Sequence, residues 1–112
     1  MNIEIRTVGD VKILDCSGKL TLGEGTMSIR NSVRDLLNGG AKKIVLNFKD
    51  ISYVDSAGIG ELVSSYTSVV NGGGKLKLMN LSSKTHQLLT VTKLFTVFEI
   101  FENEQSALDS FK

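Results

Sequence analysis

The sequence predicts an α/β domain built on a mixed, mostly parallel sheet of about five strands, with about four helices. Two observations carry this prediction. Short apolar, β-branched segments alternate with segments whose apolar residues recur at helical spacing, and glycine-rich turns separate them. Strands that alternate with helices need crossover connections, which favours parallel pairing. A chain of 112 residues suits a single domain over residues 1–112 and is too short for two.

The sheet is expected to open with an antiparallel hairpin. Asn2–Val8 alternates apolar and polar residues, and a second strand follows over Val11–Ser17. Gly9-Asp10 between them suits a two-residue turn whose first position needs a positive φ. Cys16 is the only cysteine, so it cannot form an internal disulfide, and we expect it to be a small buried residue.

The later elements alternate between helix and strand. A loop over Leu20–Gly25 leads into a helix that ends at Asn38-Gly39-Gly40, because glycine and asparagine favour the left-handed conformation after a helix. A buried strand over Ile44–Phe48 comes next, and a helix from Asp55-Ser56 to about Val70 follows. The remaining elements are a strand over Lys75–Met79, a helix from Ser82 or Ser83 to about Thr92 with Leu88, Leu89 and Val91 inward, a strand over Val97–Phe101, and a last helix capped by Asn103.

The turn before the second helix is the most informative segment for function. It reads Asp55-Ser56-Ala57-Gly58-Ile59-Gly60 and falls at the edge of the sheet where α/β proteins usually place their sites. Ser56 is the expected N-cap, and a helix N-terminus also favours an anion. Two glycines in one helical turn cost stability, so we interpret Gly58 and Gly60 as permitting close approach of another molecule.

The helix that follows the turn is expected to have a polar outer face. Glu61, Ser64, Ser65 and Ser68 form this face, which could be a docking surface or could simply be solvated.

Composition narrows the class of protein. The net charge is +1, from 13 basic and 12 acidic residues, so no basic field suggests a nucleic-acid partner. The sequence has no signal peptide and no apolar run of membrane-spanning length, and with one cysteine it is expected to be cytoplasmic, without a membrane partner.

The sequence lacks the residues expected of the enzyme classes that its motifs suggest. A serine nucleophile elbow needs a glycine where Val54 stands, and the only candidate base is His86. The run Gly72-Gly73-Gly74-Lys75 ends a helix, whereas a phosphate-binding loop opens one. Neither a cofactor nor a metal is expected. A phosphoacceptor role for Asp55, as in a response-regulator receiver, remains an alternative, although the acidic pair and the lysine of such a site are missing.

The motif Asp55-Ser56-Ala57-Gly58-Ile59-Gly60, preceded by Ile51-Ser52-Tyr53-Val54, resembles the phosphorylation motif of bacterial anti-sigma factor antagonists, the STAS-domain family. The resemblance covers nearly the whole chain, including the opening hairpin and the segment from Leu88 to Phe101. Two positions depart from the family pattern. Glu24 is the nearest acid to a loop aspartate that contacts the partner in relatives, and Lys93 stands where a glycine is common.

The resemblance implies a regulatory protein rather than an enzyme. Such antagonists bind an anti-sigma factor that is also an ATP-dependent serine kinase, and this releases the sigma factor. The kinase phosphorylates the motif serine, here Ser56, and a serine phosphatase resets it. The implied partner-binding residues are Glu24 and the segment Asp55, Ser56, Ala57, Gly58, Ile59, Gly60 and Glu61. The free protein is expected to be a monomer. A scaffold of a stress complex or a regulatory part of a transporter is the alternative within the family.

Overall fold

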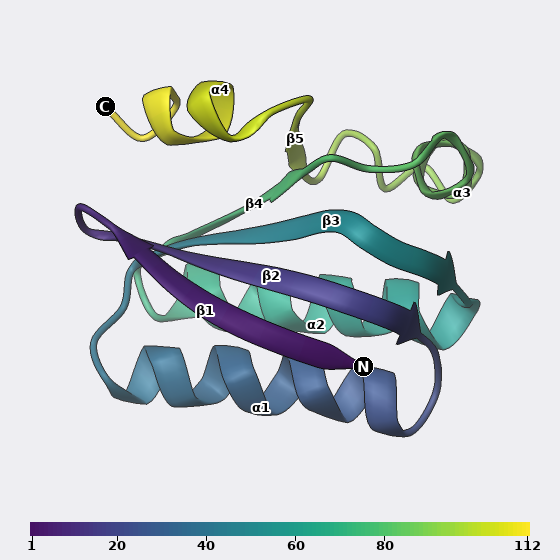
Figure 1. Cartoon of the computed structure of the whole chain (residues 1–112), viewed down its shortest axis with the longest axis horizontal. Coiled ribbons are helices and arrows are strands. Elements are labelled where there is room, and N and C mark those ends of the chain that lie inside the picture. The colour runs from purple at the N-terminus through teal and green to yellow at the C-terminus, as the bar shows by residue number, and fades with distance from the viewer.

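The computed structural model describes all residues, 1–112, and contains one five-stranded sheet with helices on both faces (Figure 1). The strand order is β1-β2-β3-β4-β5; β1 and β2 pair antiparallel, and the other neighbours pair parallel. The predicted fold class is therefore confirmed. In chain order the elements are β1 (Asn2–Val8), β2 (Val11–Leu20), α1 (Glu24–Asn38), β3 (Lys43–Val54), α2 (Ser56–Asn71), β4 (Lys75–Met79), α3 (Ser83–Val91), β5 (Glu99–Phe101) and α4 (Glu104–Asp109).

Two apolar cores lie on opposite faces of the sheet. Figure 1 shows α1 and α2 side by side on one face and α4 on the other. The larger core joins the sheet to α1 and α2 and also includes Leu89 of α3 and Phe98. The smaller core joins Val11, Ile13, Val45 and Met79 of the sheet to Ala107 of α4, and all five residues are almost completely buried. Because both faces are covered, the middle of β3 is a continuous apolar run, and Ile44, Val45 and Leu46 are all fully buried.

The opening hairpin has the predicted geometry. Gly9 has a φ of 62°, which a residue with a Cβ adopts at a cost, and β1 pairs with β2 from Asn2 opposite Ser17 to Val8 opposite Val11. Cys16 is 2% exposed, as expected. Burial raises the pKa of its thiol to about 12, so the side chain is a protonated, unreactive core residue at neutral pH.

Both strands that lead to the Ser56 turn are longer than predicted. β2 ends at Leu20 rather than Ser17, and β3 ends at Val54 rather than Phe48. Pairing of β3 with β4 stops at Asn47, whereas pairing with β2 continues to Leu20 opposite Val54. The last part of β3 is therefore an edge, where exposed polar residues interrupt the apolar pattern on which the prediction relied.

Further differences lie between α3 and β5. Of the two capping residues predicted for α3, Ser82 and Ser83, the structure uses Ser82, and the cap predicted at Asn103 is confirmed. Each of these side chains accepts a hydrogen bond from a backbone N–H three residues later. Val91 was predicted to point inward, but it is 72% exposed. β5 begins at Glu99, two residues later than predicted. Lys93 has a φ of 62°, a left-handed conformation that glycine adopts more readily than lysine.

Candidate functional site

Asp55, not Ser56, caps helix α2. Asp55 has extended backbone angles, and its carboxylate accepts hydrogen bonds from the backbone N–H of Gly58 at 2.7 Å and of Leu22 at 3.1 Å. The predicted N-cap at Ser56 is therefore wrong, because the chain becomes helical at Ser56 itself. The hydrogen bond from Gly58 and then that from Leu22 lower the pKa of Asp55, so the carboxylate is ionised at neutral pH.

Ser56 is the first residue of α2 and is exposed. Its hydroxyl makes no hydrogen bond within the chain, so it is free to meet a second molecule. It lies at the carboxyl-terminal edge of the parallel strands, beyond the end of β3 (Figure 1). The helix N-terminus beneath it already interacts with the Asp55 carboxylate, and a second anion at Ser56 would lie close to that negative charge.

The two glycines of the turn have different environments. Gly58 is buried, and a Cβ there would collide with the backbone oxygen of Leu20 and lie 2.9 Å from the Leu20 Cγ and 3.1 Å from the Val54 Cγ1. Gly58 thus lets α2 pack against the end of β2, which corrects its interpretation as room for a partner. Gly60 is exposed and has no atom within 4 Å of its Cβ position, so its surface is open.

The expected polar outer face of α2 is only partly correct. Glu61 is 4% exposed and Ser65 is 3% exposed, because both lie against α1. The Glu61 carboxylate pairs with Arg30 of α1 at 2.7 Å and accepts a hydrogen bond from the Ser65 hydroxyl at 3.3 Å. Ser64 and Ser68 are exposed as expected. Ile59 is also buried, at 4% exposure, in the larger core. Ile59 and Glu61 are therefore part of the packing rather than of the exposed surface.

The exposed surface around Ser56 includes apolar residues that the sequence analysis did not identify. Leu22 is 78% exposed and is held beside the turn by its hydrogen bond to Asp55. Tyr53, three residues before Ser56, is 57% exposed, and Met27 in the first turns of α1 is 55% exposed. Exposed apolar side chains that lie together often mark interaction sites. Met27 could have been noticed because it falls outside the apolar face of its helix.

Glu24 also belongs to this edge. It opens α1, its side chain is 84% exposed, and it pairs with the N-terminal ammonium of Met1 at 3.3 Å. Asp55 and Glu24 therefore place negative charge at the starts of both helices. Hereafter the Ser56 surface denotes Leu22, Glu24, Met27, Tyr53, Asp55, Ser56, Ala57 and Gly60.

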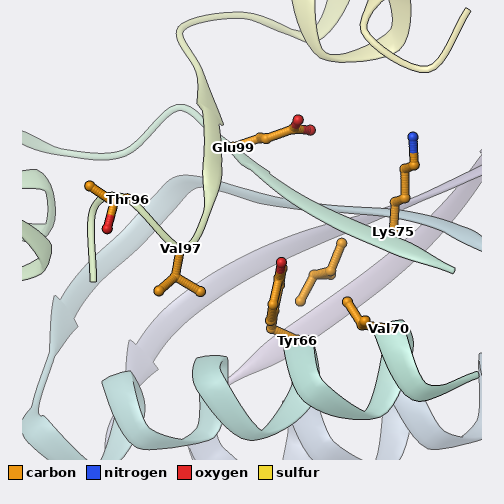
Figure 2. Close-up of a pocket in the computed structure, with 7 residues that line it drawn as sticks. Tyr66, Val70, Lys75, Thr96, Val97 and Glu99 are labelled. Carbon is orange, nitrogen blue, oxygen red and sulfur yellow. The ribbon is translucent and has the colours of Figure 1, made fainter. Parts of the chain in front are cut away.

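The structure has a hollow next to the Ser56 surface and another at the β5 edge of the sheet. One, of about 360 Å³, lies between the end of β3 and the start of α3 and is lined by Tyr53, Val54, Lys84 and their neighbours, so it adjoins the Ser56 surface. Another, of about 320 Å³, lies at the β5 edge between Tyr66, Val70 and Val97 (Figure 2). In the second, the amine of Lys75 points away from the hollow, and Glu99 pairs with Lys77 at 2.8 Å.

No group of three or more His, Cys, Asp or Glu side chains is placed to hold a metal ion. No helix is both long and apolar enough to cross a membrane.

Comparison with known proteins places this architecture in a family. The STAS domain family matches residues 2–107. The chain belongs to the STAS domain family.

Among its relatives is the anti-sigma F factor antagonist of Paenibacillus polymyxa, 27% identical over 108 residues that cover 96% of this chain and 92% of the relative. A crystal structure from Thermotoga maritima, assigned as an anti-sigma factor antagonist, is 28% identical with a TM-score of 0.89, covering 96% and 92% of the two chains. The Bacillus protein SpoIIAA in its phosphorylated form is 19% identical with a TM-score of 0.77, covering 99% and 100%, and supports the fold alone.

Proposed function

We propose that this STAS domain is an anti-sigma factor antagonist whose binding to an anti-sigma factor is switched off by phosphorylation of Ser56. One observation carries the proposal: an exposed serine hydroxyl without a partner in the chain stands at the first turn of α2, next to an ionised aspartate and exposed apolar side chains. The names of its relatives support the antagonist role.

The unphosphorylated surface suits a protein partner. Leu22, Met27 and Tyr53 offer exposed apolar area, and methionine and tyrosine are enriched in protein interfaces. Ser56 follows Tyr53 by three residues and Asp55, the hydrogen-bond acceptor of Leu22, by one. Its neutral hydroxyl is a small group that a partner can cover without burying a charge on Ser56 itself. An anti-sigma factor bound here would no longer hold its sigma factor, which is the consequence expected of an antagonist.

Phosphorylation would reverse this fit. A phosphate adds roughly −1.5 to −2 charges at neutral pH. The Gly58 N–H, which could otherwise bind an anion, already donates to the Asp55 carboxylate, so that carboxylate competes with the phosphate for the helix N-terminus. The partner would then have to bury an unpaired charge, which costs several kcal/mol, while about 1.4 kcal/mol already weakens binding tenfold.

The chemistry in this proposal is carried out by other proteins. In the proposal, the anti-sigma factor is itself the serine kinase that transfers the phosphate from ATP, and a serine phosphatase removes it. The domain supplies the acceptor hydroxyl and the surface that both must recognise. The buried members of the motif, Gly58, Ile59 and Glu61, act by positioning the turn.

The test uses the partner recovered on the immobilised protein from a lysate of its own source and identified by mass spectrometry. A kinase-like ATPase is the expected partner, and recovery of a transporter subunit alone would contradict the proposal. With the kinase and ATP, Ser56→Ala should retain binding and take up no phosphate, and Ser56→Asp should weaken binding.

Ser64→Ala and Ser64→Asp are matched controls, because Ser64 is an exposed serine of the same helix outside the Ser56 surface. Both should behave as the wild type does. Full phosphorylation of Ser56→Ala would show that the site is elsewhere, and a phosphate that is rapidly lost in acid, where a serine phosphate ester survives, would indicate an acyl phosphate on Asp55.

A further inference from the structure

Strand β1 leaves a long, open edge on the sheet. It is the first strand in the order β1-β2-β3-β4-β5 and pairs only with β2, so the outward backbone groups of its seven residues have no strand partner (Figure 1). At the opposite edge β5 has only three residues. An exposed edge of this length is a template for pairing with another strand unless the sequence opposes it.

The sequence of β1 is complementary to itself when two copies run antiparallel. The strand spans Asn2–Val8, so Ile5 is its midpoint, and Glu4 and Arg6 flank it. Pairing centred on Ile5 places Ile5 opposite the second copy's Ile5 and places Glu4 opposite Arg6 twice. Ile5 is 48% exposed in the single chain, so this contact would cover apolar surface. Opposite charges directly across a strand pair stabilise it, whereas like charges destabilise it.

Arg6 can accept this additional partner. Its guanidinium donates through Nε and Nη2 to Asp15 and through Nη1 and Nη2 to Glu104, with the Nε–Asp15 distance at 2.5 Å and the shorter Glu104 distance at 2.6 Å. These bonds use four of the five N–H groups of an arginine, which leaves one on Nη1. Glu4 forms no ion pair within the chain, so its exposed carboxylate is available to that donor.

We propose that two copies of this chain form a two-fold symmetric dimer by antiparallel pairing of their β1 strands, with Ile5 on the axis. The result is a continuous ten-stranded sheet. Two seven-residue strands bury less than the roughly 1,200 Å² typical of stable complexes, so the dimer should form in a concentration-dependent manner. The exposed edge thus argues against the monomer expected from sequence.

This dimer is compatible with the Ser56 surface but does not depend on the proposed function. Antiparallel pairing reverses the direction of one sheet relative to the other. The two Ser56 surfaces, which lie at the carboxyl-terminal edge of the parallel strands, would then face opposite ends of the assembly. Both would remain free to bind a partner, which makes the dimer bivalent.

Sedimentation velocity of the full chain over a series of concentrations tests the association. The wild type should shift from monomer to dimer as concentration rises. Glu4→Arg puts like charges opposite one another twice and should weaken dimerisation about tenfold or more. Glu102→Arg makes the same charge change at an exposed residue outside β1 and should have no effect. A wild type that stays monomeric at every concentration, or equal dimerisation of Glu4→Arg, would overturn the proposal.

Cysteine cross-linking tests the register. Ile5→Cys places two thiols on the two-fold axis and should give a disulfide-linked dimer on mild oxidation. Thr7→Cys lies two residues further along the same strand, opposite Ile3 of the second copy, so its two thiols would be about 14 Å apart and should not cross-link. The wild type is the blank, since Cys16 is buried and protonated. Equal cross-linking of both variants, or none for Ile5→Cys, would refute this register.

Discussion

Replacing Gly58 with alanine tests whether this glycine serves the packing of α2 or the access of a partner. The added Cβ would overlap the backbone oxygen of Leu20, a rigid group that also accepts a hydrogen bond from the Asp55 N–H at 3.2 Å. Overpacking of this kind costs about 1–3 kcal/mol, and we take the upper end because backbone cannot rotate away. Alanine recovers about 1 kcal/mol of helix propensity. The net expected loss is therefore about 2 kcal/mol.

Gly60→Ala is the matched control, two residues along the same helix. Its Cβ would meet no atom within 4 Å, so only the propensity gain of roughly 0.5–1 kcal/mol remains and the variant should be more stable than the wild type. Urea unfolding followed by far-ultraviolet circular dichroism measures the two free-energy changes. In thermal unfolding, the Tm should fall by about 8 °C for Gly58→Ala and rise by about 2–4 °C for Gly60→Ala. Changes of the same sign, or a Gly58→Ala protein as stable as the wild type, would refute the packing role.

Three further predictions concern other residues. Hydrogen bonds to the ionised form lower the pKa of Asp55, so the stability that this carboxylate contributes is present above its unfolded pKa near 3.8 and is lost as pH falls through its folded pKa. The difference in stability between the wild type and Asp55→Asn should therefore narrow in urea titrations as pH falls below 3.8. A difference that stays constant with pH would contradict this. Arg30→Ala should destabilise the domain by about 2 kcal/mol, because it leaves the buried Glu61 carboxylate without its counter-ion. Glu61→Gln should destabilise it less, because the exposed Arg30 guanidinium returns to water. The reverse order in urea unfolding would be inconsistent with the burial of Glu61. Lys93→Gly should stabilise the domain by about 1 kcal/mol by relieving a left-handed backbone, and thermal unfolding showing a loss would count against strain at this position.

The order of elements was predictable because it depends on local patterns. Helical spacing, glycine-rich stops and the side-chain caps at Ser82 and Asn103 are visible in the sequence, and the structure contains each of them. The end of β3 was not predictable, because Lys49–Tyr53 looks like a loop until one knows that β4 stops beside Asn47. The length over which two strands pair depends on both strands, so it could not be predicted from the sequence of β3 alone.

The site was predicted in outline and not in its details. The turn at Asp55-Ser56 lies where the sequence indicates, but two good capping residues stand side by side, and only the backbone angles decide between them. Glu61 looks like a surface residue until Arg30 is found against it. Likewise, Gly58 looks functional from the sequence alone. A glycine is needed there because the carbonyl of Leu20, which is distant in sequence, leaves no room for a Cβ.

The carboxylate of Asp55 has a consequence for how the surface responds as a whole. It holds the first turn of α2 through Gly58 and the loop before α1 through Leu22, and the backbone N–H of Asp55 is itself held by Leu20. The first turn of α2 and the loop before α1, which are more than thirty residues apart in the chain, are therefore each joined to Asp55 by one hydrogen bond to its carboxylate. A charge added next to it acts on both segments directly, so no long-range conformational change is needed for Leu22 to sense an event at Ser56.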